Sequence, residues 1–185
     1  MSVLAIIVSI VGYGKSGKTA FAESLIRRVV AEGLTVAAIK TGRLSHGDRD
    51  RELLARAAQP AVPDSRRLSL AGADPVLLWT EEGIAIEGER DRKSPTPLPG
   101  REEFAKGWQE ALPRALLEGI LSRDLILLEG RPVPGAMTIQ MRNMETGTVK
   151  YPLEKQHRVL AGPEDFDGAK EQVLNALKGA VKNAG

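Results

Sequence analysis

The residues best suited to chemistry lie near the amino end, in the segment GYGKSGKT at positions 12–19. This segment fits the pattern G-x-x-x-x-G-K-[ST] at every fixed position. In such a loop the glycines let successive backbone N–H groups turn inward, and the following helix N-terminus adds positive potential, so the pocket suits phosphate oxygens. Lys18 would reach the terminal phosphates and the Thr19 hydroxyl would hold Mg²⁺. We predict a nucleoside-triphosphate site (GTP or ATP) formed by Gly12, Gly14, Lys15, Ser16, Gly17, Lys18, Thr19 and Ala20.

The segments on either side of this loop have the required order. Residues 3–11 form a continuous apolar, β-branched run typical of a strand buried on both faces. Residues 18–33 repeat apolar side chains at helical spacing and end at Gly33, which suits the C-terminal cap. Strand, loop and helix in this order favour a phosphate loop over a glycine-rich turn that merely contains Lys18.

Two further residues are candidates for the same site. Glu129 ends an apolar strand and precedes Gly130, so its carboxylate could hold Mg²⁺ or a magnesium-bound water, although an acidic residue can also simply end a strand. Lys40 ends the second predicted strand, at the carboxyl edge where ligands bind in open α/β sheets. We therefore predict Lys18, Glu129 and Lys40 as catalytic residues, with Thr19 and Glu129 at the metal.

Other polar residues have simpler interpretations. Asp124 begins the strand of Glu129 at the opposite sheet edge and is expected to be a solvated turn residue. His46, in a polar loop, and the Lys15 side chain are expected to be solvated, and Asp64 could be only a helix N-cap. Residues 89–101 carry several basic side chains in a proline-rich stretch, which predicts a mobile loop and leaves open a basic lid.

Strands and helices alternate along the rest of the chain. This alternation predicts an α/β, P-loop NTPase-like three-layer fold, with a mostly parallel sheet and antiparallel hairpin additions, in one nucleotide-binding domain over residues 1–185. The expected strands are 35–40, 124–130 and 157–162, with hairpins at 74–88 and 136–153. The expected helices are 49–58, 64–72, 104–120 with a break at Pro113, and 164–181.

Composition excludes several classes of protein. The chain has no Cys, so it forms no disulfide, thiolate metal site or catalytic thiol. Its 26 basic residues are interleaved with 24 acidic ones and aromatics make up only 4 %, which argues against nucleic-acid binding. No apolar run approaches the roughly 18 residues of a membrane span, so we expect a cytoplasmic protein with no membrane partner.

Taken together, these motifs resemble those of the MobB family, the P-loop adapter proteins of molybdopterin guanine dinucleotide biosynthesis that are related to metal-insertion GTPases. The resemblance depends on the phosphate loop at 12–19, Lys40, the D-S-x-R segment at 64–67, A-G-A at 71–73, and Glu-Gly at 129–130. The first motif occurs in very many proteins, so only the combination points to this family. Departures at 41–43 and at Arg131 are those of a divergent member.

The resemblance implies a GTP-binding accessory protein, a homodimer that docks on a MobA-like guanylyltransferase and assists the attachment of GMP to molybdopterin. No N-K-x-D or T-K-x-D motif reads guanine, so the preference for GTP is implied by the resemblance alone. No glutamine or arginine is an obvious activator of water, so any GTPase activity should be slow. A small-molecule or nucleotide kinase with a basic lid, and a module that binds a phosphorylated cofactor without chemistry, remain alternatives.

Overall fold

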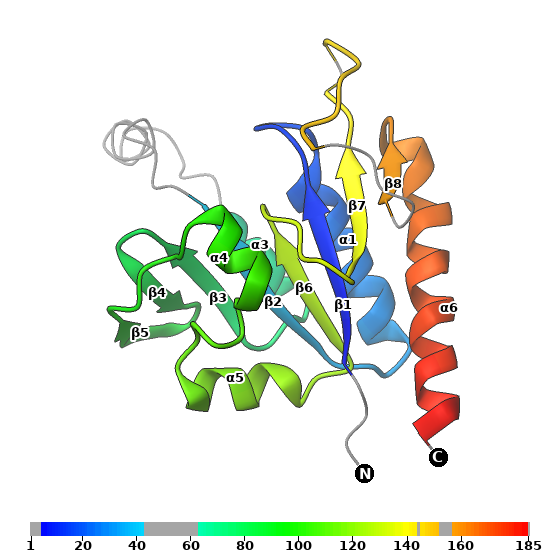
Figure 1. The fold of residues 1–185 in the computed structure, drawn as a ribbon. Helices are drawn as coiled ribbons and strands as arrows, with labels where there is room; N and C mark the ends of the chain where they lie inside the picture. The colour runs from blue at the N-terminus through cyan, green and yellow to red at the C-terminus, as the bar shows by residue number, and fades with distance from the viewer. Residues whose placement is uncertain (1–4, 43–62, 144, 152–156, 185) are drawn as a thin grey trace, which may run out of the picture.

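The computed structural model describes residues 5–42, 63–143, 145–151 and 157–184, and arranges them as one sheet between two layers of helices (Figure 1). In the described residues the sheet has eight strands in the order β5-β4-β3-β2-β6-β1-β7-β8. The strands are β1 (Ile6–Val11), β2 (Val36–Thr41), β3 (Val76–Thr80), β4 (Gly83–Ile86), β5 (Glu89–Ser94), β6 (Leu125–Glu129), β7 (Met137–Met141) and β8 (His157–Leu160). The helices are α1 (Lys18–Ala31), α3 (Asp64–Leu70), α4 (Arg101–Gly107), α5 (Arg114–Leu121) and α6 (Phe166–Ala184), with a 3₁₀ turn η1 (Pro163–Asp165) before α6.

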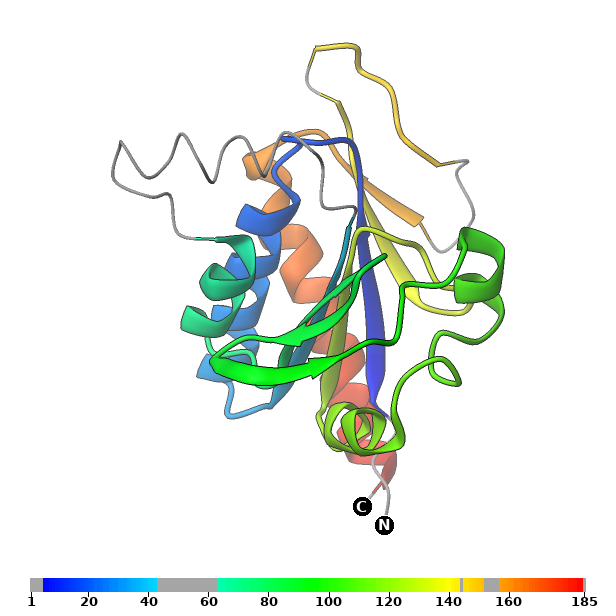
Figure 2. The same ribbon diagram turned by 90° about the vertical axis from the view of Figure 1, so that its left-hand side faces the viewer.

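The strands from β3 to β8 in the sheet order are parallel, whereas β4 and β5 are antiparallel additions at one edge. Parallel strands need helical crossovers, which cover both faces of the sheet. Figure 2 shows α1, α3 and α6 on one face and α4 and α5 on the other. The predicted α/β fold with a mostly parallel sheet and antiparallel additions is confirmed.

Each face of the sheet has its own core. On β2, Val36 and Ala38 pack in the cluster that includes the buried residues of α1 and α6, whereas Ala37 and Ile39 pack in the cluster that includes the buried residues of α4 and α5. Alternate residues of a strand point to opposite faces, which is why β2 reads as a continuous apolar run. The next residue, Lys40, therefore points to the α1 face and Thr41 to the α4 face.

Two sequence predictions at the sheet edges are wrong. Residues 89–94, expected in a mobile loop, form β5 and pair with β4, because an edge strand needs only backbone hydrogen bonds on one side and tolerates charged side chains. The hairpin expected at 136–153 is absent from the described residues: β7 pairs in parallel with β8, and residues 148–151 form no strand. Both errors arise where pairing depends on backbone contacts rather than on apolar periodicity.

The helix predictions fare better. Pro113 separates α4 from α5 as expected, and the stripe that they share is buried at Phe104, Trp108, Leu112 and Ile120. The helix expected at 49–58 and His46 lie outside the described residues. Within the described ranges, none of the helices combines the length and the apolar character needed to span a bilayer.

Candidate functional site

The phosphate-loop segment forms an irregular turn between β1 and α1. Gly12 and Gly17 adopt φ values of 156° and 87°, which side chains rarely tolerate, and a Cβ on Gly12 would lie 2.7 Å from Ser16 Oγ. A Cβ on Gly14 would meet no atom within 4 Å, so open space adjoins the backbone there. The loop thus has the tight turn and the exposed backbone that phosphate binding requires.

Lys18 begins α1 and folds back over this turn. Its Nζ donates to the carbonyl oxygen of Tyr13 at 2.5 Å, which keeps the ammonium group inside the loop. Burial lowers the pKa of Lys18 below its ordinary value, and the charges of Lys40 and Lys150 lower it further although Glu129 opposes them. A cation held in such a place is poorly solvated and would gain from an anionic neighbour.

Glu129 brings the predicted residues together at the end of β6. Its Oε1 accepts hydrogen bonds from Thr19 Oγ1 at 3.1 Å and from Lys40 Nζ at 2.7 Å. The side chain is only 2 % exposed, and its Oε2 is buried without a hydrogen-bond partner in the described residues. A buried carboxylate oxygen without a partner is costly, so this atom is the part of the site that a ligand or its water would complete.

Lys40 lies between two carboxylates. Besides Glu129, its Nζ contacts Asp64 Oδ2 at 3.0 Å. Burial favours the neutral form of Lys40, but the charge and hydrogen bonds of Glu129 and Asp64 outweigh it and raise the lysine pKa. For Asp64, burial acts to raise the pKa, but the hydrogen bond and charge of Lys40 prevail and lower it. Lys40 is therefore cationic at neutral pH.

Asp64 is a site residue that the sequence interpretation undervalued. The N-cap of α3 is Pro63, with no side-chain cap, so the alternative of Asp64 as an N-cap is wrong. Asp64 instead reaches Lys40, while Arg67 donates from Nε and an Nη atom to Glu23 Oε2 on α1, at 3.1 and 2.8 Å. The D-S-x-R segment thus ties α3 to both α1 and the end of β2. The signal for this role in the sequence was an acidic and a basic residue, Asp64 and Arg67, three apart on a short helix.

The donor set suits a magnesium ion that accompanies a triphosphate. Mg²⁺ prefers oxygen ligands and keeps several waters, and proteins bind it through one or two side chains together with substrate phosphates. Thr19 and Glu129 supply a hydroxyl and a carboxylate, and the unpartnered Oε2 of Glu129 is free to accept from a metal-bound water. No group of three or more metal-binding side chains occurs among the described residues, so such an ion would depend on the phosphates.

Residues on the α4 face of the strand ends were also missed. Gln140 on β7 is fully buried, and its amide accepts from Tyr151 N at 2.6 Å and donates to Tyr151 O at 3.2 Å. Arg131 donates to Pro99 O and lies over the Phe104 ring, with Cζ 5.3 Å from its centroid. A buried glutamine inside an apolar strand was the one sequence signal for this arrangement.

The remaining candidates are placed as follows. Asp124 is not a free turn residue: its Oδ2 accepts from Thr35 N and Thr35 Oγ1, each at 2.7 Å, at the amino end of the strand pair. Lys15 is exposed, with a φ of 60°, as expected for a surface charge. Arg101 begins α4 instead of belonging to a mobile loop.

Comparison with known proteins gives one family. A search of curated proteins finds no match. The solved structures include a MobB protein homologue from Bacillus stearothermophilus, 19 % identical over 93 % of this chain and 97 % of that chain with a TM-score of 0.42. They also include Bacillus subtilis MobB, 19 % identical over 90 % and 96 % of the two chains with a TM-score of 0.35. The model of the MobB family, described as molybdopterin guanine dinucleotide synthesis protein B, matches residues 7–161, and the chain therefore belongs to this family.

Proposed function

We propose that this chain is a nucleotide-binding accessory protein of molybdopterin guanine dinucleotide synthesis, which binds GTP with Mg²⁺ and hydrolyses it slowly. Membership of the MobB family supports the pathway, and the phosphate-loop geometry supports the nucleotide. We further propose that it acts in the cytoplasm as a homodimer that docks on a guanylyltransferase, a role for which the family membership is the support. In this proposal residues 1–185 act as one domain.

One observation carries the proposal: Thr19, Lys40 and Glu129 come from three separate elements and meet beside the phosphate loop. The Glu129 carboxylate at their centre is buried, and one of its oxygens has no partner in the part of the chain that the structure describes. Their sequence separations of 110 and 89 residues exclude a local turn as the reason. A buried carboxylate oxygen without a partner among the described residues is uncommon for a purely structural side chain. A hydrated Mg²⁺ on the triphosphate would complete it.

Each residue then has a distinct task. Lys18 would leave the Tyr13 carbonyl and pair with the β and γ phosphates. Their negative charge would stabilise an ammonium group that burial leaves poorly solvated. Thr19 and Glu129 would hold Mg²⁺ and its water through the hydroxyl and carboxylate that now bind each other, and the ion would neutralise charge on the phosphates. Lys40, held by Glu129 and Asp64, lies where a γ phosphate would compete for its ammonium group.

Hydrolysis is expected to be slow without a partner. The buried glutamine of the described residues, Gln140, has its amide engaged with the backbone of Tyr151 and cannot orient an attacking water. The kinase alternative also weakens, because part of its expected lid, residues 89–94, is a paired strand. Nucleotide should therefore bind more readily than it turns over.

A calorimetric titration with GTP and ATP tests the nucleotide site. Lys18→Ala should weaken GTP binding by about 10- to 100-fold, since a charge-assisted hydrogen bond contributes roughly 1.5–3 kcal/mol. Glu129→Gln should reduce the gain in affinity that Mg²⁺ provides by about tenfold. Asp124→Asn makes the same chemical change at the other end of β6 and should leave binding unaltered. Equally weak GTP and ATP binding by the wild type and Lys18→Ala would overturn the assignment.

A further inference from the structure

A cavity lies against the ends of β2 and β6, on the α4 face of the sheet. It has a volume of about 600 Å³, and Thr41, Gly130, Arg101 and Tyr151 are among its lining residues. Thr41 and Gly130 directly follow Lys40 and Glu129 in sequence, so they turn to the opposite face of the strands. The cavity is therefore next to the nucleotide site but opens on the other side of the sheet edge.

The floor of this cavity is bare backbone. Gly130 has a φ of 116°, and a Cβ there would lie 2.5 Å from the Thr41 carbonyl oxygen. The Thr41 hydroxyl donates to the Glu129 carbonyl at 3.1 Å, and this hydrogen bond links the ends of β2 and β6. A ligand in the cavity would thus meet backbone one peptide away from the carboxylate that serves the nucleotide.

Two cationic side chains converge on one ring in this cavity. Arg101 Cζ lies 5.9 Å and Lys150 Nζ 5.6 Å from the centroid of Tyr151. Both residues are exposed, and neither takes part in an ion pair found among the described residues. Burial lowers the pKa of Lys150, and the charge of Arg101 lowers it further. Two like charges held near one ring repel each other, and an anion between them would reduce that repulsion.

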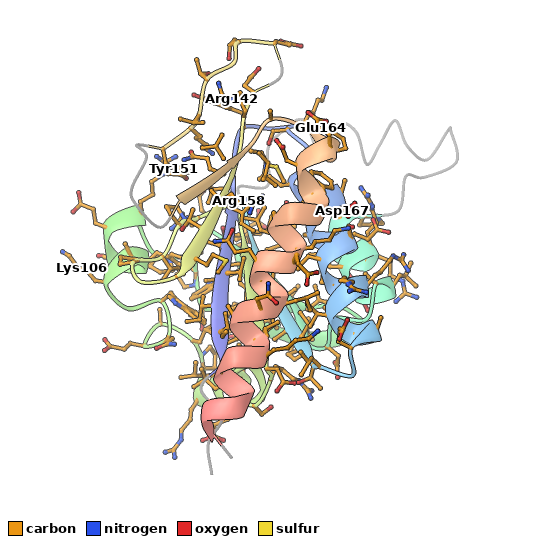
Figure 3. The ribbon with its side chains drawn as sticks, turned by 90° about the vertical axis from the view of Figure 1, so that its right-hand side faces the viewer. Lys106, Arg142, Tyr151, Arg158, Glu164 and Asp167 are labelled. Carbon is orange, nitrogen blue, oxygen red and sulfur yellow. The ribbon has the colours of Figure 1, made fainter. Side chains whose placement is uncertain are left out.

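The wall that carries these cations is held in place. The buried amide of Gln140 binds both backbone atoms of Tyr151, whose hydroxyl donates to the Gly130 carbonyl at 3.4 Å. On the other side, the Tyr13 hydroxyl of the phosphate loop donates to Val149 O at 3.4 Å. Figure 3 shows Tyr151 beside the end of β7, on the side that faces α4 and Lys106. Residues 149–151 therefore contact the phosphate loop at one end and line the cavity at the other.

We propose that this cavity binds the phosphate monoester group of a second, cofactor-sized molecule, with Arg101 and Lys150 on the phosphate and Tyr151 against its body. The volume falls within the range of small-molecule sites. Among the described lining residues, Arg101, Arg131 and Lys150 face a single acidic residue, Glu81, so the wall is cationic overall. The inference deepens the proposed function, because it places a second ligand beside the nucleotide, but its test can be read without GTP.

The test uses 4-methylumbelliferyl phosphate as the monoester, with 4-methylumbelliferone and inorganic phosphate as comparison ligands, each titrated calorimetrically into the full chain. The double variant Arg101→Gln/Lys150→Gln should weaken binding of the monoester by about tenfold or more. Lys106→Gln/Arg114→Gln removes two exposed charges elsewhere and should leave it unaltered. Umbelliferone without phosphate, and inorganic phosphate without the ring, should both bind more weakly than the monoester.

The outcomes separate the two proposals. Retention of monoester binding in Lys18→Ala, whose GTP binding should be weakened, supports a separate cavity. Monoester binding by a wild type that fails to bind GTP would sink the nucleotide proposal and leave the cavity assignment standing. No binding to the wild type, equal binding by both double variants, loss in Lys18→Ala with displacement by GTP, or affinity no greater than that of inorganic phosphate would each overturn the monoester site.

Discussion

The two ends of the β2–β6 strand pair carry carboxylates of the same kind in opposite circumstances. At the amino end, one oxygen of Asp124 takes two hydrogen bonds from Thr35, and the side chain is partly exposed. At the carboxyl end, one oxygen of Glu129 takes two hydrogen bonds from Thr19 and Lys40, but the side chain is buried and its second oxygen has no described partner.

This difference separates a structural carboxylate from one prepared for a ligand. Water can satisfy the second oxygen of Asp124, so its two hydrogen bonds simply fasten the strand ends. Glu129 is buried, and its second oxygen has no partner among the described residues, so an incoming ligand or its water could satisfy that oxygen. Burial, rather than the number of hydrogen bonds, distinguishes the two ends.

Lys40→Met should produce the largest effect on this comparison. It removes the cation from a buried pair and leaves Glu129 charged and unpaired, which typically costs about 3–5 kcal/mol of unfolding free energy. Chemical denaturation of the variant measures the loss. Adding Glu129→Gln to Lys40→Met should recover most of it, because the uncompensated charge is then gone. A loss under about 1 kcal/mol would mean that water already reaches Glu129.

Asp124→Ala should have a smaller effect that is confined to stability. It removes two hydrogen bonds in a partly exposed place, so we expect a loss of about 1–2 kcal/mol in the same denaturation experiment. GTP affinity should stay at the wild-type value, because Asp124 lies at the opposite sheet edge from the phosphate loop. A matching fall in nucleotide affinity would show that the two ends are not independent.

Asp64→Asn should have the smallest effect, visible mainly in acid. The pKa of Asp64 is lowered in the folded chain, so its contribution to stability is present above the unfolded pKa and is lost as pH falls through the folded one. The wild type should therefore lose stability more steeply than the variant below about pH 4. Thermal unfolding measured between pH 2 and 7 checks this, and parallel curves for both proteins would contradict it.

Much of the nucleotide-facing half could be predicted from the sequence. The spacing of the phosphate loop fixes local geometry, and the apolar runs before Lys40 and Glu129 place both residues at the carboxyl edge of a parallel sheet. These features depend on short-range patterns. The direct contacts among Thr19, Lys40 and Glu129 follow once the strands pair in register.

The other half of the molecule could not be predicted in the same way. The pairing of β5 with β4 joins a mostly charged strand to an uncharged one, and no apolar periodicity in β5 predicts it. Tyr151 is positioned by the side chain of Gln140, whereas the hairpin expected at 136–153 would have joined the two segments through backbone pairing. Asp64 was underrated because its partner, Lys40, lies on another element. In each of these cases, the contact that the sequence did not predict joins residues on separate segments.

Gly130 gives the sheet edge a further property. A methyl group would not fit between it and Thr41, so the ends of β2 and β6 approach each other closely where the cavity meets the strand end that carries Glu129. Lys150, which lines the cavity, already influences the pKa of Lys18, so a negative charge bound at Lys150 would change the electrostatic potential at Lys18. If the nucleotide changes the affinity of the cavity for its ligand by some factor, that ligand must change the affinity for the nucleotide by the same factor.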